Sequence, residues 1–301
     1  MPSGIVLLDK PEGLSSNGAL QRVRRLLKAD KAGHAGSLDP LATGMLPIFL
    51  DEATKIAGEI LSSRKRYRFT IGLGVRTATG DREGEIVERS AVTDLPPARI
   101  EAVLGGFRGP GLQIPPMYSA LKREGRPLYE LARSGVVVER QARPIEIFEL
   151  RLLGHRGECL ELETHCSKGT YVRTLAEDIA RKLGTCGHVT VLRRLCVEPF
   201  DQEPMQTLES LALACERGET PSILPADWPL MHLPAVRLEA GQAERIRHGQ
   251  PVALAGEKSR TGKVRLYGAE GGFFGIGEAD GCGNVRPKRL FKSEDTGQSR
   301  S

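Results

Sequence analysis

The feature that most constrains this chain is a segment in which apolar and polar residues alternate strictly. It spans residues 67–73, where tyrosine, phenylalanine, isoleucine and leucine alternate with arginine, threonine and glycine. This period of two is typical of an antiparallel strand with one buried face, and residues 145–152 and 160–166 repeat it. Helices are predicted at residues 97–104, 127–133, 171–183 and 208–215. Because strands and helices do not alternate regularly, the sequence predicts an α+β fold with a mainly antiparallel sheet.

The first sixty residues are predicted to form a strand and two helices around one irregular segment. The apolar run 5–8 predicts the strand, and the turn residues of Lys10-Pro11-Glu12-Gly13 end it. Ser15 and Ser16 are candidate N-caps of a helix whose apolar residues recur at spacings of three and four. Asp51 is expected to cap the second helix, which carries its apolar residues on one side.

The irregular segment between these helices is a candidate functional loop. Residues 33–47 read GHAGSLDPLATGMLP, and three glycines and two prolines break both regular periods. A long irregular segment inside a compact domain is more often functional than decorative. It holds His34 and Asp39, but each has a simpler interpretation, because Asp-Pro initiates turns and a lone loop histidine is usually just hydrogen-bonded.

Two further stretches hold candidate site residues. Tyr67 lies on the apolar face of the alternating segment, where core packing is the simplest interpretation. At residues 167–173, which read SKGTYVR, the strand pattern is followed by a helix that ends at Gly184. Tyr171 and Arg173 are expected in its first turn, where free N–H groups and a guanidinium can meet an anion or a carboxylate.

Composition limits the partners of this chain. With 43 basic and 38 acidic residues the net charge is +5, and basic clusters at 22–31, 64–68 and 286–289 would suit a phosphate backbone. The six cysteines are interpreted as reduced thiols. No Cys or His pair has zinc-ligand spacing and no complete dinucleotide loop is present, so neither a metal nor a nicotinamide cofactor is expected. No apolar run approaches the ~18 residues of a membrane span and no leader follows Met1, which predicts a cytoplasmic protein without membrane attachment.

The pattern changes after the proline-rich stretch 220–234. A short helix at 240–248 and strand segments near 252, 264–267, 273–277 and 285 are spaced as in a small barrel. A second domain is therefore expected to begin near residue 232. The polar residues 292–301 are expected to form a frayed tail.

Six blocks of this sequence together resemble one family. They are LLDKPEGLSS (7–16), GHAGSLDPLATGMLP (33–47), KRYRFTIGLGVRTATGD (65–81), IPPMYSALK (114–122), SKGTYVRTLAEDIA (167–180) and HVTVLRRL (188–195). In this order they resemble the bacterial tRNA pseudouridine-55 synthases, the TruB-type family, from the start to about residue 200. The remainder resembles that family's small RNA-binding PUA domain. The resemblance implies a pseudouridine synthase catalytic domain at 1–231, a β-barrel-like PUA domain at 232–291 and a flexible tail at 292–301.

The resemblance also implies an activity and its residues. The family isomerises a uridine in the T loop of tRNA: the N1–C1′ bond is cut, the uracil turns and rejoins through C5, and neither water nor a cofactor is consumed. Asp39 would be the catalytic residue, Arg173 would lower the pKa of its carboxyl and keep it ionised, and Tyr67 would stack on the uracil and serve the proton transfers. The residues that the resemblance places around the substrate are Lys10, His34, Tyr171 and Leu192.

Several alternatives stay open at this point. Asp39 could attack C1′ of the ribose, attack C6 of the uracil or help to form a glycal. The enzyme would evert its target base, with His34 in the vacated space, and the C-terminal domain would bind the acceptor stem. A tRNA-binding folding helper is the alternative function, and a nucleoside hydrolase that releases uracil is the third. The sequence has no oligomerisation seam, so a monomer is expected.

Overall fold

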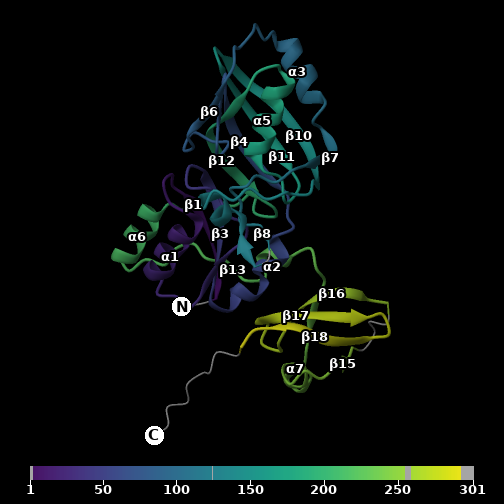
Figure 1. Cartoon of the computed structure of the whole chain (residues 1–301). Helices are drawn as coiled ribbons and strands as arrows, with labels where there is room; N and C mark the ends of the chain where they lie inside the picture. Colours follow the sequence, from purple (N-terminus) through teal and green to yellow (C-terminus); the bar gives the residue numbers. More distant parts are fainter. Residues whose placement is uncertain (1–2, 124, 255–258, 293–301) are drawn as a thin grey trace.

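The computed structural model describes residues 3–123, 125–254 and 259–292. A nine-stranded mixed sheet forms the body, and a separate five-stranded sheet lies at the C-terminal end (Figure 1). The large sheet has the order β13-β1-β3-β12-β4-β11-β10-β7, with β2 paired to β3. All of its strand pairs are antiparallel except β12 with β3. The predicted α+β fold with a mainly antiparallel sheet is therefore confirmed.

The elements of the body have the following bounds. The strands of the large sheet are β1 (Gly4–Lys10), β2 (Ala32–His34), β3 (Thr43–Leu50), β4 (Lys65–Leu73), β7 (Gly109–Gln113), β10 (Arg143–Arg156), β11 (Cys159–Cys166), β12 (Gly187–Val197) and β13 (Leu224–Pro225). Two small hairpins are β5 (Val75–Thr77) with β6 (Ile86–Arg89), and β8 (Lys122–Arg123) with β9 (Arg126–Pro127). The helices are α1 (Ser16–Leu26), η1 (Asp51–Ile56), α2 (Ala57–Ile60), α3 (Pro97–Gly105), α4 (Leu128–Arg133), α5 (Val172–Lys182), α6 (Leu208–Glu216) and η2 (Trp228–Leu230).

The three alternating segments are neighbours in the sheet. They form β4, β11 and β10, and the register places Phe69 opposite Leu162 and Tyr67 opposite Thr164. Phe69 and Leu162 are fully buried because both point to the face that α5 covers. The four predicted body helices are also found, as α3, α4, α5 and α6.

The predicted loop at 33–47 is wrong at both ends. Gly33 and His34 belong to β2, and β3 starts at Thr43, so the irregular part is only residues 35–42, which we call the Asp39 loop. Gly44 has a φ of +99°, and a Cβ there would lie 2.2 Å from the Arg194 carbonyl oxygen, so glycine allows β3 to approach β12. Pro47 is tolerated inside β3 because β2 ends beside it, so its missing N–H interrupts no ladder.

Helix starts are partly as predicted. Ser15 caps α1, and its side chain accepts from the Gly18 N–H at 3.0 Å. Asp51 does not cap a helix: it has a φ of +49°, lies inside η1, and its Oδ1 accepts from the Lys31 N–H at 3.0 Å. The predicted helix after it is a 3-10 turn followed by the short α2.

Apolar clusters fix the layers around the sheet. On one side, α3 and α5 cover β4, β10 and β11, with Phe69 packed among residues such as Leu175. Helices α1 and α6 pack on β1 and β3 in a second cluster. A third cluster joins Phe49 of β3 to Ile276 of the C-terminal sheet. The C-terminal part is thus packed against the body through buried apolar side chains.

The C-terminal sheet contains the helix and strands that the sequence predicted. Its elements are β14 (Ala235–Arg237), α7 (Ala240–Arg247), β15 (Val252–Ala253), β16 (Thr261–Tyr267), β17 (Phe273–Asp280) and β18 (Asn284–Leu290), in the sheet order β14-β16-β17-β18-β15. Lys263 pairs with Glu59 at 2.5 Å, and the Lys55 ammonium donates to the Leu290 carbonyl at 2.8 Å, so polar contacts also join this sheet to the body. Residues 293–301 of the expected tail lie outside the described residues.

Among the described residues, no helix is long and apolar enough to cross a bilayer. In the same part of the chain, no three His, Cys, Asp or Glu side chains gather as a set of metal ligands. All six cysteines have free thiols.

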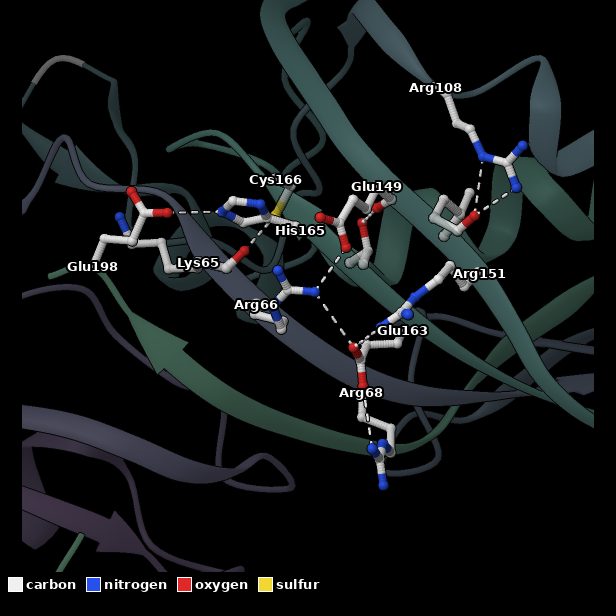
Figure 2. Close-up of polar contacts among 12 residues, drawn as sticks. Lys65, Arg66, Arg68, Arg108, Glu149, Arg151, Glu163, His165, Cys166 and Glu198 are labelled. Atoms are coloured by element: carbon white, nitrogen blue, oxygen red, sulfur yellow. Dashed lines mark hydrogen bonds and ion pairs between the residues drawn. The ribbon is translucent and has the colours of Figure 1, made fainter. Parts of the chain in front are cut away.

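The other face of the sheet carries a network of charged side chains (Figure 2). Arg68 lies between Tyr67 and Phe69 on β4, so it points away from α5. The outer arginine cluster consists of Arg66, Arg68, Arg151, Glu149 and Glu163. Glu163 accepts from three guanidiniums, those of Arg151 at 2.7 Å, Arg68 at 3.1 Å and Arg66 at 3.5 Å.

Candidate active site

The Asp39 loop is fastened to the start of α1 and to the end of β1. The Ser16 hydroxyl accepts from the Leu38 N–H at 2.7 Å and donates to the Leu38 carbonyl at 3.0 Å. The Gly13 N–H donates to the Pro40 carbonyl at 2.9 Å. These contacts hold the residues before and after Asp39. They therefore fix the backbone from which its carboxyl extends.

Asp39 forms a bidentate ion pair with Arg173. The Nε of Arg173 lies 2.8 Å from Oδ2 of Asp39, and Nη2 donates to Oδ1 at 3.2 Å. Arg173 is buried in the first turn of α5, where Nη1 donates to the Thr79 carbonyl and Nη2 to the Tyr118 carbonyl, both at 2.7 Å. The planar fork of arginine suits this arrangement, because each of its three nitrogens faces an acceptor.

A second carboxylate, Asp81, faces the same guanidinium and was missed by the sequence interpretation. Its Oδ2 lies 3.8 Å from Arg173 Nε, and its Oδ1 accepts from the Thr79 hydroxyl at 2.5 Å and the Glu83 N–H at 3.1 Å. Asp81 is 4% exposed. The signal was present, because Asp81 is the last residue of the block 65–81, but no sequence spacing connects it to Arg173.

The ionisation of Asp39 reflects opposing influences. Burial raises the pKa of the Asp39 carboxyl above its ordinary value, and the negative charge of Asp81 adds to this rise. Arg173 and Lys10 lower it, but their effect is smaller than that of burial. Arg173 thus lowers the pKa of Asp39 as the resemblance implied, but burial and Asp81 together outweigh it and the net shift is upward.

Lys10 is buried beside the Asp39 loop and supports it through hydrogen bonds. It is fully buried at the end of β1, and its Nζ donates to the carbonyls of Leu14 at 2.7 Å, Pro11 at 2.8 Å and Pro40 at 3.3 Å. Burial lowers the pKa of Lys10 to about 8, while the charge of Asp39 opposes this shift. The structure thus places Lys10 at the base of the Asp39 loop.

Tyr67 and Leu192 form an apolar wall on neighbouring strands. Tyr67 is half-buried on β4 and packs against the cluster that includes Leu192 of β12 and Leu38 of the Asp39 loop. Burial raises the pKa of the Tyr67 phenol, and the positive charge of Arg194 opposes this rise. An aromatic ring, an aliphatic side chain and a carboxylate loop therefore share one cluster.

His34 and Tyr171 lie at the ends of elements. His34 ends β2, its Nδ1 is buried without a hydrogen-bond partner among the described residues, and burial lowers the pKa of its imidazole. Tyr171 is the residue before α5 rather than part of its first turn. Its N–H donates to Gln113 Oε1 at 2.7 Å, and its carbonyl accepts from Gln113 Nε2 at 3.1 Å.

A cavity of about 500 Å³ adjoins Arg173 on the side of residues 112–118. Thr79, Tyr118, Glu177 and Arg181 line it together with Arg173, whereas Asp39 does not. The guanidinium of Arg173 therefore separates the carboxyl of Asp39 from this cavity. The arrangement at Asp39 can hold a carboxylate rigidly next to an aromatic and an aliphatic surface, as chemistry on a planar base requires.

Three family models match consecutive parts of the chain and define its class. The model described as "TruB family pseudouridylate synthase (N terminal domain)" matches residues 24–172. The "tRNA pseudouridylate synthase B C-terminal domain" matches residues 173–230, and "Pseudouridine synthase II TruB, C-terminal" matches residues 234–291. The class that these matches define is that of the pseudouridine synthases, a group of isomerases.

Close relatives cover nearly the whole chain. The tRNA pseudouridine synthase B of Hydrogenovibrio crunogenus is 48% identical over 299 residues, which cover 99% of this chain and 97% of that protein. The protein of the same name from Stutzerimonas stutzeri is 49% identical over 296 residues, covering 97% and 96%. The chain therefore belongs to the TruB family of pseudouridylate synthases.

Solved structures share the fold at lower identity. A chain of the "Crystal Structure of a Cbf5-Nop10-Gar1 Complex" matches with a TM-score of 0.71 and 24% identity, covering 96% of this chain and 85% of that one. A chain of the archaeal box H/ACA sRNP Nop10-Cbf5 complex matches with a TM-score of 0.70 and 23% identity, covering 97% and 87%. These matches support the α+β fold with a PUA-like C-terminal sheet.

Proposed function

We propose that this chain converts a uridine of tRNA, the one at position 55 in the T loop, into pseudouridine, with Asp39 as the catalytic residue. The observation that carries the proposal is the bidentate pair of Asp39 with the buried Arg173, in a loop whose Leu38 belongs to the apolar cluster that contains Leu192 and packs against Tyr67. A carboxylate held in this way is oriented before the substrate arrives, which is how an enzyme avoids reorganisation during the reaction.

The reaction is an isomerisation, so the substrate nucleotide and the product nucleotide contain the same atoms. The N1–C1′ bond breaks, the uracil rotates, a C5–C1′ bond forms, and the proton of C5 is exchanged for one on N1. Asp39 supplies the anionic group that assists bond breaking, by attack at C1′, by attack at C6 or by proton removal that leads to a glycal. Tyr67 stacks on the base and serves in the proton transfers.

Binding requires that the target base leave its stack in the folded tRNA. Eversion costs a few kcal/mol, and His34, whose ring is half-buried and whose Nδ1 has no partner among the described residues, would occupy the vacated space. Tyr171 and Leu192 complete the substrate pocket, and Lys10 borders it from the base of the Asp39 loop. Phosphate contacts from basic side chains offset the cost of eversion, so binding is expected to weaken as salt rises.

The rest of the assignment follows from this substrate. We infer a catalytic domain at 1–231, a PUA domain at 232–291 that holds the acceptor stem, and a short tail at 292–301. The match of one family model up to residue 230 and of the next from residue 234 supports this division. The enzyme works as a monomer in the cytoplasm, where its tRNA substrate is made and used.

The test is incubation of the purified chain with unmodified tRNA, followed by mapping of pseudouridine. Pseudouridine at position 55 alone is the expected result, and a tRNA with cytidine at that position is the matched control. Release of free uracil would instead indicate a hydrolase, and tRNA binding without any product would indicate a folding helper.

Asp39→Asn separates chemistry from binding. The amide keeps the size of the side chain but removes the negative charge, so turnover should fall by roughly 10⁴-fold or more. The Kd for tRNA should change little, because Asp39 is a small part of the RNA contact area. Turnover near that of the original chain would contradict the role of Asp39, whatever the substrate.

A further inference from the structure

Arg194 is the largest fully buried side chain of the described residues, and it has a full positive charge. Its neighbour Arg193 pairs with Asp9 at 2.7 Å, and Arg173 pairs with Asp39. Within the described part of the chain, no carboxylate lies within ion-pair distance of Arg194. A buried charge without a counter-charge is strongly disfavoured, so its presence at this point of the fold calls for an explanation.

The guanidinium of Arg194 joins three parts of the chain. It extends from β12, its Nε donates to the Met45 carbonyl of β3 at 2.7 Å, and its Nη2 donates to the Gly36 carbonyl of the Asp39 loop at 3.0 Å. Gly36 has a φ of +86°, and a Cβ there would be 3.5 Å from Nη1 of Arg194. The loop therefore passes directly over the guanidinium, three residues before Asp39.

Arg194 also lies opposite Tyr67. The two residues are register partners in the antiparallel pair of β12 and β4, and their side chains leave the sheet on the same face. The positive charge of Arg194 lowers the pKa of the Tyr67 phenol, against the larger effect of burial. The same guanidinium acts on His34, where its charge adds to the effect of burial in lowering the pKa. One side chain thus bonds the catalytic loop and lies beside the pocket aromatic.

We propose that Arg194 is a positioning residue of this active site, which holds the Asp39 loop against the sheet through Gly36 and orients the hydroxyl of Tyr67 for proton transfer. The proposal rests on the proposed function. A neutral donor could satisfy one carbonyl, but the rigid fork of arginine serves both carbonyls while its charge lies next to the phenol. This positive charge stabilises the phenolate, which is the form of Tyr67 that can accept a proton.

The experiment compares Arg194→Gln and Arg194→Lys with the control Arg193→Gln. The control changes the adjacent residue and breaks its half-exposed ion pair with Asp9. Turnover is measured with unmodified tRNA at saturating and limiting concentrations. We expect kcat to fall by about 10²-fold in both Arg194 variants, because small displacements of reacting groups have effects of this size, while KM changes by less than about threefold. The control should keep both constants.

The contact with Tyr67 is tested by a double-mutant cycle. If Arg194 acts through the phenol, Arg194→Gln should reduce kcat less in a Tyr67→Phe background than in the original chain. Strictly additive losses would overturn the orientation of Tyr67. A kcat within about threefold of the original in a folded Arg194→Gln chain would overturn the proposal as a whole.

Two further readouts distinguish positioning from a purely structural role. Should Arg194→Gln not fold, the same kinetics on Arg194→Lys decide, since lysine keeps the charge but loses the fork, and added guanidinium ion should restore part of its kcat. Full activity of Arg194→Lys or no rescue by guanidinium would count against the fork. If the original chain forms no pseudouridine, the proposed function fails, and that result is distinct from a failure confined to the Arg194 variants.

Discussion

Two sets of arginine–carboxylate pairs lie on opposite faces of the same sheet, and their surroundings differ. In the outer arginine cluster, Glu163 is shared by three guanidiniums whose side chains are between 29% and 58% exposed (Figure 2). At the active site the order is reversed, because one guanidinium, that of Arg173, is shared by two carboxylates and is only 5% exposed.

This difference shows that exposure of a carboxylate does not by itself set the direction of its pKa shift, since the Glu163 side chain is 8% exposed and that of Asp39 is 35% exposed. The two carboxylates also differ in the number of guanidiniums around them. Exposed pairs gain little, since water and salt screen them. Burial opposes the ionisation of Glu163, but hydrogen bonds from Arg151 and Arg68 prevail and lower the pKa of its carboxyl. For Asp39 burial prevails, and the pKa is raised. A carboxylate that is costly to keep ionised is a reactive one, and this is expected at a functional site.

Among the changes that test this comparison, loss of the buried guanidinium should have the largest effect. Arg173→Ala removes the partner of Asp39 and two donors to buried carbonyls, so we expect kcat to fall by about 10²–10³-fold and stability to fall by about 3 kcal/mol. Activity assays and thermal melts measure both. Arg181→Ala on the same helix, where the side chain is 71% exposed, is the control and should change neither. Normal turnover of Arg173→Ala would show that the buried pair of Arg173 with Asp39 is not needed for catalysis.

The two faces of the sheet should respond to acid at different pH values. Because the pKa of Asp39 is raised, its carboxylate is lost at a higher pH than the ordinary 3.8 as the solution is acidified, so kcat should fall on an acid limb above that value. Because the pKa of Glu163 is lowered from 4.5, its contribution to stability is complete above that value and disappears only as pH falls through the lowered pKa. Activity should thus be lost before unfolding, as followed by kcat and circular dichroism over the same pH series. Simultaneous loss would contradict this order.

Lys10→Met sharpens the acid prediction. The ammonium of Lys10 lowers the pKa of Asp39, so its removal should move the acid limb of kcat to higher pH. The pH profile of kcat measures the shift, and Lys288→Met in the C-terminal sheet is a control that should leave the limb in place. A shift to lower pH would mean that Asp39 is not the group that titrates.

The smallest effect is expected at the outer arginine cluster. Glu163→Gln leaves three arginines without their shared carboxylate, yet most of them remain hydrated, so stability should fall by only about 1–2 kcal/mol. Urea unfolding measures this change. Turnover should stay within about twofold of the original, and a large loss of kcat would show that the outer face takes part in catalysis.

The comparison also shows where sequence patterns reach their limit. Helix α1 is predictable because its cap at Ser15 and its apolar spacing are local. The strand β3 is not, because Gly44 and Pro47 break strands in general, and only the approach of Arg194 and the end of β2 make them acceptable here. The strand β12 was missed for a similar reason: two arginines interrupt its apolar pattern, and both find partners far away in the chain.

Sequence by itself determined the strands with alternating residues, the helices with regular apolar spacing and, through six ordered blocks, the family. The resemblance to the family implied that Asp39 meets Arg173, 134 positions away, whereas only the tertiary structure decided that Asp81 shares the same guanidinium and that Arg194 lies beneath the loop. The physical reason is that periodicity acts over a few neighbouring residues, whereas burial and register bring distant side chains together and set their ionisation.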